Sequence, residues 1–191
     1  LPAALTAELT LRYPDGHTDT ICTDASWQTA ESAVRFSELY DGETYDAAFE
    51  PSVWTPAVIC DSPTDTLIEQ QGEPVREQER IAPARIFKTP AGETVVDFGQ
   101  NLTGYVEIAL DGAKGEAVEL SHAEVLDKNG NFYTENYRSA KAKYLYFCKD
   151  GAQRYKPKLT FYGFRYIRVD RFPGGAETAA PENFTAIAVY S

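Results

Sequence analysis

The feature that most constrains this chain is a repeated alternation of apolar and polar side chains, broken at short intervals by turn residues. In residues 5–13, Leu9 and Leu11 point one way and Thr10 points the other, and residues 184–191 repeat the pattern. A period of two is typical of a β-strand, and no long amphipathic helix is visible. The sequence therefore predicts an all-β protein built from antiparallel, jelly-roll-like β-sandwiches.

Turn chemistry separates the expected strands. "PDGH" (14–17) joins residues 5–13 to "TDTICTD" (18–24) as a hairpin, because Gly16 is free to take a positive φ. Further strands are expected in the second half of the chain, at residues 105–110, 115–126, 142–148, 159–170 and 184–191. "SAVRFSELY" (32–40) has room for two helical turns at most.

A boundary is expected in "GEPVREQER" (72–80), which is polar and contains a glycine and a proline. It divides the chain into a first β-module at 1–75, which we expect to be incomplete, and a β-sandwich at 76–191. We expect the chain to be a fragment of a longer protein, so the lack of a signal peptide carries no information.

The charge balance limits the partners. Eighteen basic and 29 acidic residues give a net charge of −11, which opposes binding to nucleic acid or to an anionic membrane. No apolar run approaches the roughly 20 residues of a membrane span. Three distant cysteines are expected to be unpaired thiols. The negative charge does not exclude neutral sugars, or cations such as calcium, as ligands.

An acidic segment is the candidate binding site. It contains Tyr40, Asp41, Glu43, Tyr45 and Asp46. Carboxylates suit calcium, and a sugar can stack on tyrosine rings while its hydroxyls bond to carboxylates. Asp41, Glu43 and Asp46 are therefore the candidate metal ligands, with Tyr40 and Tyr45 as sugar platforms. The competing interpretation is an exposed acidic turn, or an acid paired with an arginine.

Two other motifs have structural interpretations. Arg165 shares a strand face with apolar residues and should not be buried unpaired, so we expect an ion pair with Asp97 or Glu124. "DKNGNFYTE" (127–135) has oxygen ligands at alternate positions, but its glycine is misplaced for a calcium-binding EF-hand loop. Its Asn-Gly pair favours a plain hairpin.

Catalytic motifs are missing from the sequence. The two histidines, His17 and His122, are expected in a turn and in a packing role within a strand, respectively. There is no nucleophile elbow, zinc-protease helix motif or phosphate-cradling loop. The sequence does not identify which two of the 29 acids could form a carboxylate pair for glycoside hydrolysis. We therefore expect no independent enzymatic activity.

Several stretches together resemble the non-catalytic part of bacterial α-L-rhamnosidases, glycoside hydrolase family 78. They are "LTLRYPDGHTDTICTDASWQTAESAV" with "LYDGETYDAAFE" in the first half, and "VVDFGQNLTGYVEIAL" through "FYGFRYIRVDRFPG" in the second. The D-x-G-Q-N and G-F-R-Y signatures are the most specific. The first half is similar to the later part of the family's N-terminal β-domain, and the second to the β-sandwich that precedes the catalytic domain.

The resemblance implies that catalysis belongs to an (α/α)6 barrel beginning after "AIAVYS", which cleaves terminal α-L-rhamnose with inversion. This chain alone would be inactive and would support the barrel, which is its expected partner. The residues expected to hold the sandwich and its interface with the barrel are Asp97, Gln100, Asn101, Phe164, Arg165 and Tyr166. Without the barrel, an apolar patch of several hundred Å² or a dimer that covers it is expected. The alternative is a calcium-dependent module that binds rhamnose-containing glycans.

Overall fold

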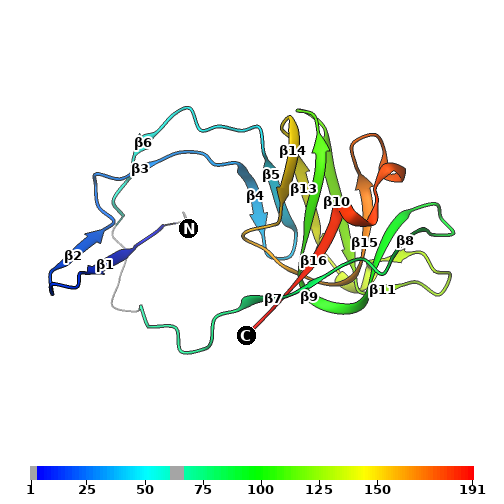
Figure 1. The fold of residues 1–191 in the computed structure, drawn as a ribbon, viewed down its shortest axis with the longest axis horizontal. Helices are drawn as coiled ribbons and strands as arrows, with labels where there is room; N and C mark the ends of the chain where they lie inside the picture. Colours follow the sequence, from blue (N-terminus) through cyan, green and yellow to red (C-terminus); the bar gives the residue numbers. More distant parts are fainter. Residues whose placement is uncertain (1–3, 61–66) are drawn as a thin grey trace. The chain divides into compact units, whose positions relative to one another are not determined.

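The computed structural model describes residues 4–60 and 67–191, and the chain divides into two compact units. Unit 1 comprises Leu1–Ser32 and Glu50–Gln71, and unit 2 comprises Ala33–Phe49 and Gly72–Ser191. Nearly all regular structure is β-strand, so the all-β prediction is confirmed (Figure 1). No helix in the two described ranges is long and apolar enough to cross a membrane.

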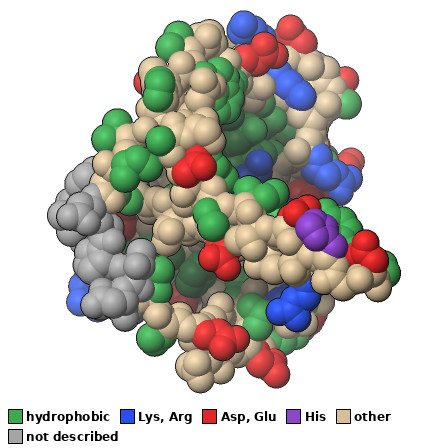
Figure 2. All heavy atoms as spheres, turned by 90° about the vertical axis from the view of Figure 1, so that its left-hand side faces the viewer, with side chains coloured by type: hydrophobic (Ala, Val, Ile, Leu, Met, Phe, Trp, Pro, Cys, Tyr) green, Lys and Arg blue, Asp and Glu red, His purple; other side chains and the backbone are tan. Residues whose placement is uncertain are grey.

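The described residues of unit 1 contain two short antiparallel pairs, β1 (Glu8–Arg12) with β2 (Thr18–Cys22) and β3 (Gln28–Thr29) with β6 (Thr55–Pro56). The predicted hairpin is confirmed, and Gly16 in its turn has a φ of +89°. None of the described residues of unit 1 is buried, however. The alternating pattern predicts a half-buried strand, but a two-stranded pair offers no second layer to cover its apolar face. In Figure 2, apolar side chains are visible on the surface among acidic ones.

Unit 2 is built on one curled sheet of ten strands, in the order β4-β5-β13-β10-β15-β9-β16-β7, with β8 and β14 also paired to β9 (Figure 1). Its bounds are β4 (Val34–Glu38), β5 (Gly42–Asp46), β7 (Arg76–Ile81), β8 (Arg85–Lys88), β9 (Thr94–Gly112), β10 (Ala117–Ala123), β13 (Lys143–Phe147), β14 (Gly151–Tyr155), β15 (Tyr162–Arg171) and β16 (Phe184–Tyr190). All neighbours are antiparallel except β5 and β13. The small pair β11 (Val125–Leu126) and β12 (Phe132–Tyr133) completes the strands.

The long strand β9 gives the sheet its curvature. Its first part pairs with β8 and β15, and its last part pairs with β16 and β14. Where it turns from one set of partners to the other, Gly104 lies so close to β16 that a Cβ there would stand 1.9 Å from the carbonyl oxygen of Ile187. A single strand therefore serves both halves of the sandwich. Three short 3-10 turns, Glu135–Tyr137, Ala176–Thr178 and Pro181–Asn183, lie in the connections.

The core lies between the inward faces of the curled sheet. It is formed by aliphatic residues of β9, β10, β15 and β16 and by a cluster of aromatic rings, among them Tyr144, Tyr146, Tyr155, Tyr162, Phe164 and Phe184. The strands predicted in the second half of the chain are confirmed as β9, β10, β13, β15 and β16.

Residues 32–40, where the sequence left room for two helical turns, contain strand β4 instead. Its Phe36 pairs with Thr44 of β5, and β5 in turn lies beside β13. Pairing with a preformed sheet outweighs a weak helical tendency in so short a segment. Residues 33–40 of this segment belong to unit 2, although they precede the expected boundary by more than thirty residues in the sequence.

Candidate functional site

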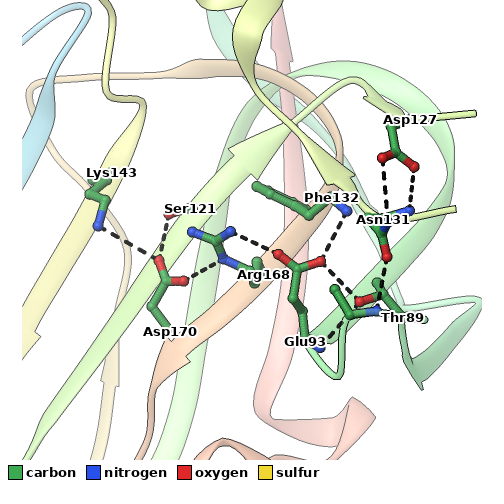
Figure 3. Close-up of polar contacts among 10 residues, drawn as sticks. Thr89, Glu93, Ser121, Asp127, Asn131, Phe132, Lys143, Arg168 and Asp170 are labelled. Atoms are coloured by element: carbon green, nitrogen blue, oxygen red, sulfur yellow. Dashed lines mark hydrogen bonds and ion pairs between the residues drawn. The ribbon is translucent and has the colours of Figure 1, made fainter. Parts of the chain in front are cut away.

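A polar cluster of unit 2 is centred on Arg168 of β15 (Figure 3). Its Nε donates to Oδ1 of Asp170 at 2.5 Å, and its Nη1 donates to Oε1 of Glu93 at 3.0 Å. The guanidinium carbon lies 4.9 Å from the ring centroid of Phe132, a cation–π contact. Burial opposes the charge of the guanidinium, but the two carboxylates outweigh it and raise the pKa of Arg168. Arg168 is thus a permanent cation held on three sides.

Glu93 extends this cluster to the β11–β12 hairpin. Its Oε2 accepts hydrogen bonds from the backbone N–H of Phe132 at 3.1 Å and from the Thr89 hydroxyl at 2.9 Å. Burial acts to raise the pKa of Glu93, but these bonds and Arg168 together hold it below its usual value. On the other side, Oδ2 of Asp170 accepts from the Ser121 hydroxyl at 2.5 Å. The cluster links a loop, a hairpin and two strands, and its charged groups are occupied by one another (Figure 3).

A second cluster surrounds Asp97, which is only 2% exposed. Arg165 donates to both of its oxygens, from Nε at 2.8 Å and from Nη2 at 3.1 Å, and Arg85 donates to Oδ2 at 3.3 Å. Burial acts to raise the pKa of Asp97, but Arg165, the Gly99 N–H and Arg85 outweigh it and lower the pKa. The predicted ion pair of Arg165 with Asp97 is confirmed. The other predicted partner, Glu124, accepts instead from the side-chain amide of Asn101 at 3.3 Å.

Of the six residues predicted at the interface with a barrel, three are buried and three are exposed or partly exposed. Phe164 is fully buried and packs edge-on against Phe98, and Asp97 and Tyr166 are also buried. Side chains so placed stabilise the sandwich and do not present a surface to a partner. Gln100 and Asn101 are exposed, and Arg165 is partly exposed. The interface prediction therefore rests on these three residues.

Glu43, one of the predicted metal ligands, is 2% exposed and fully engaged by the fold. Its Oε1 accepts from the hydroxyl of Tyr155 at 2.7 Å, and its Oε2 accepts from the backbone N–H groups of Lys158 and Leu159 at 3.1 and 3.0 Å. The phenol hydrogen bond and burial raise the pKa of Tyr155 well above its usual value, with burial the larger cause. Glu43 thus anchors residues 158–159 to β5, as a buried carboxylate must be bonded.

The other two predicted acids, Asp41 and Asp46, have partners of their own. Asp41 pairs with Lys141 at 2.6 Å, and Oδ1 of Asp46 accepts from the backbone N–H of Ala48 at 3.0 Å. Tyr45 is stacked on Tyr155 with ring centroids 4.0 Å apart. Tyr40 is 67% exposed and can meet a ligand.

Among the described residues, no group of three or more His, Cys, Asp and Glu side chains could hold a metal ion. The calcium site stays a prediction.

His122 is completely buried in the core and matches the predicted packing role. Its Nδ1 donates to the carbonyl oxygen of Ala142 at 2.8 Å, and its ring stacks on Tyr162 with centroids 3.8 Å apart. Its Nε2 has no hydrogen-bond partner among the described residues. Burial lowers the pKa of His122 to about 4, against a smaller opposing effect of the Ala142 carbonyl and Asp170. The imidazole is therefore neutral at neutral pH.

The loop at 127–131 is the predicted hairpin, with Leu126 paired to Phe132. Oδ1 of Asp127 accepts from the backbone N–H groups of Asn129 and Asn131, both at 2.8 Å, which lowers its pKa. The carboxylate thus closes its own turn.

All three cysteines are free, as predicted, and only Cys148 is buried. Burial raises the pKa of its thiol to about 11.

Sequence reasoning missed the cluster around Arg168. The sequence "RVDR" does contain Arg168 and Asp170 at alternate positions, so both side chains lie on one face of a strand. That signal could have suggested an ion pair along the strand. The contact of Glu93 with Arg168 could not have been predicted in this way. Glu93 is 75 residues away in the chain and meets Arg168 only through the β9–β15 pairing.

The fold and these clusters define a β-sandwich domain whose buried charges hold strands and loops together. Residues 87–190 match the family described as the bacterial α-L-rhamnosidase concanavalin-like domain, and residues 2–79 match the α-L-rhamnosidase N-terminal domain. The first match alone covers more than half of the chain. The chain belongs to the bacterial α-L-rhamnosidase family, as the resemblance in sequence predicted.

Curated relatives agree with this assignment. The chain is 35% identical to an α-L-rhamnosidase of Streptomyces avermitilis over 93% of its own length and 18% of the relative's. It is 37% identical to an α-L-rhamnosidase of Alteromonas sp. (strain LOR) over 94% of its own length and 20% of the relative's. The chain therefore spans about a fifth of the length of these relatives.

Solved structures show the same fold. The native α-L-rhamnosidase of Aspergillus terreus superposes with a TM-score of 0.87 at 34% sequence identity, covering 97% of this chain and 23% of that chain. The Streptomyces avermitilis α-L-rhamnosidase, solved in complex with L-rhamnose, gives a TM-score of 0.87 at 32% identity over 97% of this chain and 19% of its own.

Proposed function

We propose that this chain is the non-catalytic β-sandwich part of an α-L-rhamnosidase, and that it acts as a scaffold for a catalytic (α/α)6 barrel in the same polypeptide. The complete polypeptide would hydrolyse terminal α-L-rhamnose from rhamnosides. The observation that carries the proposal is the match of nearly the whole chain to about a fifth of several α-L-rhamnosidases. A segment of that size leaves most of each relative to supply the reaction.

The bonding of the carboxylates in unit 2 favours a scaffold role over a catalytic role. Hydrolysis of a glycosidic bond with inversion needs two carboxyl groups about 6.5–9.5 Å apart, both free to meet the substrate. The buried acids Glu43 and Asp97 are each held by several donors of the fold. Glu93 and Asp170 are held by Arg168 in the same way. These carboxylates stabilise the domain itself and are not free to act on a substrate.

The isolated chain separates this proposal from its alternatives. We expect no release of nitrophenol from p-nitrophenyl α-L-rhamnoside, and no saturable heat when L-rhamnose is titrated by calorimetry, with calcium or with excess chelator. Turnover above the buffer rate would contradict a non-catalytic role. Saturable heat that vanishes with chelator would instead establish the calcium-dependent rhamnose-binding module, and Asp41→Ala would then be expected to abolish it.

A further inference from the structure

Four large apolar side chains gather at one end of unit 2, and each is about half exposed or more. They are Leu39 (47%), Tyr40 (67%), Leu159 (65%) and Phe161 (46%), here called the Leu159 patch. Two hydrogen bonds join the segments that carry them. The Thr160 hydroxyl donates to the carbonyl oxygen of Leu39 at 3.3 Å, and the Ser37 hydroxyl donates to that of Leu159 at 3.4 Å. Residues more than a hundred positions apart in the sequence thus form one surface.

The backbone under the Leu159 patch is firmly held. The buried carboxylate of Glu43 accepts from the backbone N–H of Leu159 at 3.0 Å. On the other segment, the carbonyl oxygen of Tyr40 accepts from the backbone N–H of Ala142 at 3.0 Å. These anchors fix the position of the patch while its side chains remain in contact with solvent. A preorganised apolar surface is suited to docking, because little conformational entropy is lost when it is covered.

The size of the patch indicates what kind of partner can cover it. A fully exposed aromatic residue offers about 200 Å² and leucine somewhat less, so the four exposed fractions leave roughly 400 Å² of apolar residue surface. That is within the range of patches that are functional on monomers. It is about half of the roughly 800 Å² per partner in a stable association of separate molecules. A tethered partner needs less area, because the tether supplies a high effective concentration.

We infer that the Leu159 patch is a docking face for the remainder of the longer polypeptide, an inference that rests on the proposed scaffold function. The relatives extend over about five times the length of this chain, so a tethered partner of ample size is expected. Lys158, at the edge of the patch, has no carboxylate within ion-pairing distance in the described part of the chain and lies 5.6 Å from the ring centroid of Tyr45. An apolar partner surface fits the patch, and Lys158 at its edge can pair with an acidic group of that partner.

The test uses a chimera in which residues 1–191 replace the matching segment of the Streptomyces avermitilis relative. Leu159→Asp and Phe161→Asp place a carboxylate in the docking face. Val125→Asp is the matched control, because Val125 is 47% exposed on β11, outside the patch. Hydrolysis of p-nitrophenyl α-L-rhamnoside and the Tm are measured for each chimera. Circular dichroism of the isolated chains checks that the variants fold.

We expect each patch variant to reduce the specific activity of the chimera at least tenfold and to lower its Tm, while Val125→Asp behaves as the parent chimera. The isolated chains should all unfold at the same temperature. Patch variants that match the Val125→Asp control in an active chimera would overturn this inference alone. An inactive parent chimera would instead contradict the proposed function. A dimer of the isolated chain that Leu159→Asp converts to monomer, seen by light scattering, would show that a second copy occupies the patch and would also overturn the inference.

Discussion

Unit 2 should lose stability between pH 7 and pH 5 because of one buried side chain, His122. The neutral ring donates through Nδ1 to the carbonyl oxygen of Ala142, and its Nε2 has no acceptor near it in the described structure. A proton added to Nε2 would therefore be buried without a partner, which accounts for the lowering of the pKa to about 4. The unfolded chain binds that proton near pH 6.5.

The sign and size of the effect follow from the difference between these two pKa values. Below pH 6.5, His122 binds a proton in the unfolded state, whereas in the folded state it binds one only near pH 4. The free energy of unfolding therefore falls as the pH falls. Integration between pH 7 and pH 5 gives a loss of about 2 kcal/mol. Unfolded carboxylates titrate near pH 4, so they contribute little in this interval.

Urea unfolding at pH 7, 6 and 5, followed by far-UV circular dichroism, measures this change. Tryptophan fluorescence is unsuitable, because Trp27 and Trp54 both lie in unit 1. His122→Asn keeps a donor toward Ala142 and removes the titrating ring, so its stability should be nearly independent of pH in this range. His17→Asn is the control, because His17 is exposed in a turn of unit 1 and its variant should keep the slope. A wild-type stability that is equal at pH 7 and pH 5, or a slope that survives in His122→Asn, would refute the reasoning.

Three further predictions concern unit 2. Asp97→Ala should lower the free energy of unfolding by about 2 kcal/mol, because the Gly99 N–H and two partly exposed arginines lose a buried acceptor. Asp41→Asn at the exposed Lys141 pair should change it far less in the same urea titration. Gly104→Ala should destabilise by about 3 kcal/mol, since its Cβ would stand 1.9 Å from a carbonyl oxygen of β16, and Gly72→Ala, with nothing within 4 Å, should be nearly neutral by the same measurement. A thiol reagent should titrate two cysteines in the native chain, and Cys148 only after unfolding, because it is buried and its pKa is raised to about 11; three reactive thiols without denaturant would contradict this.

The sequence predicted the strands of unit 2 well because their side-chain periodicity is local information. It also predicted that Arg165 pairs with Asp97 or Glu124, because a charge on a largely apolar face requires a partner, and the structure shows the pair with Asp97. The addition of residues 33–49 to the sheet of unit 2 was not predictable in this way. The parallel pairing of β5 with β13 joins segments about a hundred residues apart, and no local pattern encodes it.

The acidic segment shows that the candidate site, too, could not be predicted from neighbouring residues alone. Asp41, Glu43 and Asp46 are close in the sequence, which suggested that they share a ligand. Alternation along β5 separates Glu43 from Asp46, and the turn before β5 places Asp41 beside Lys141. The partners of Glu43 come from residues 155–159, which the topology supplies and the local sequence does not reveal.

The most direct test of the central claim compares the parent chimera with the same Streptomyces avermitilis relative from which the matching segment has been deleted. If this chain is the scaffold of an α-L-rhamnosidase, the chimera should hydrolyse p-nitrophenyl α-L-rhamnoside and the deletion should not. A soluble, folded chimera that is as inactive as the deletion would contradict the scaffold function, and so would a deletion that keeps the full activity of the relative.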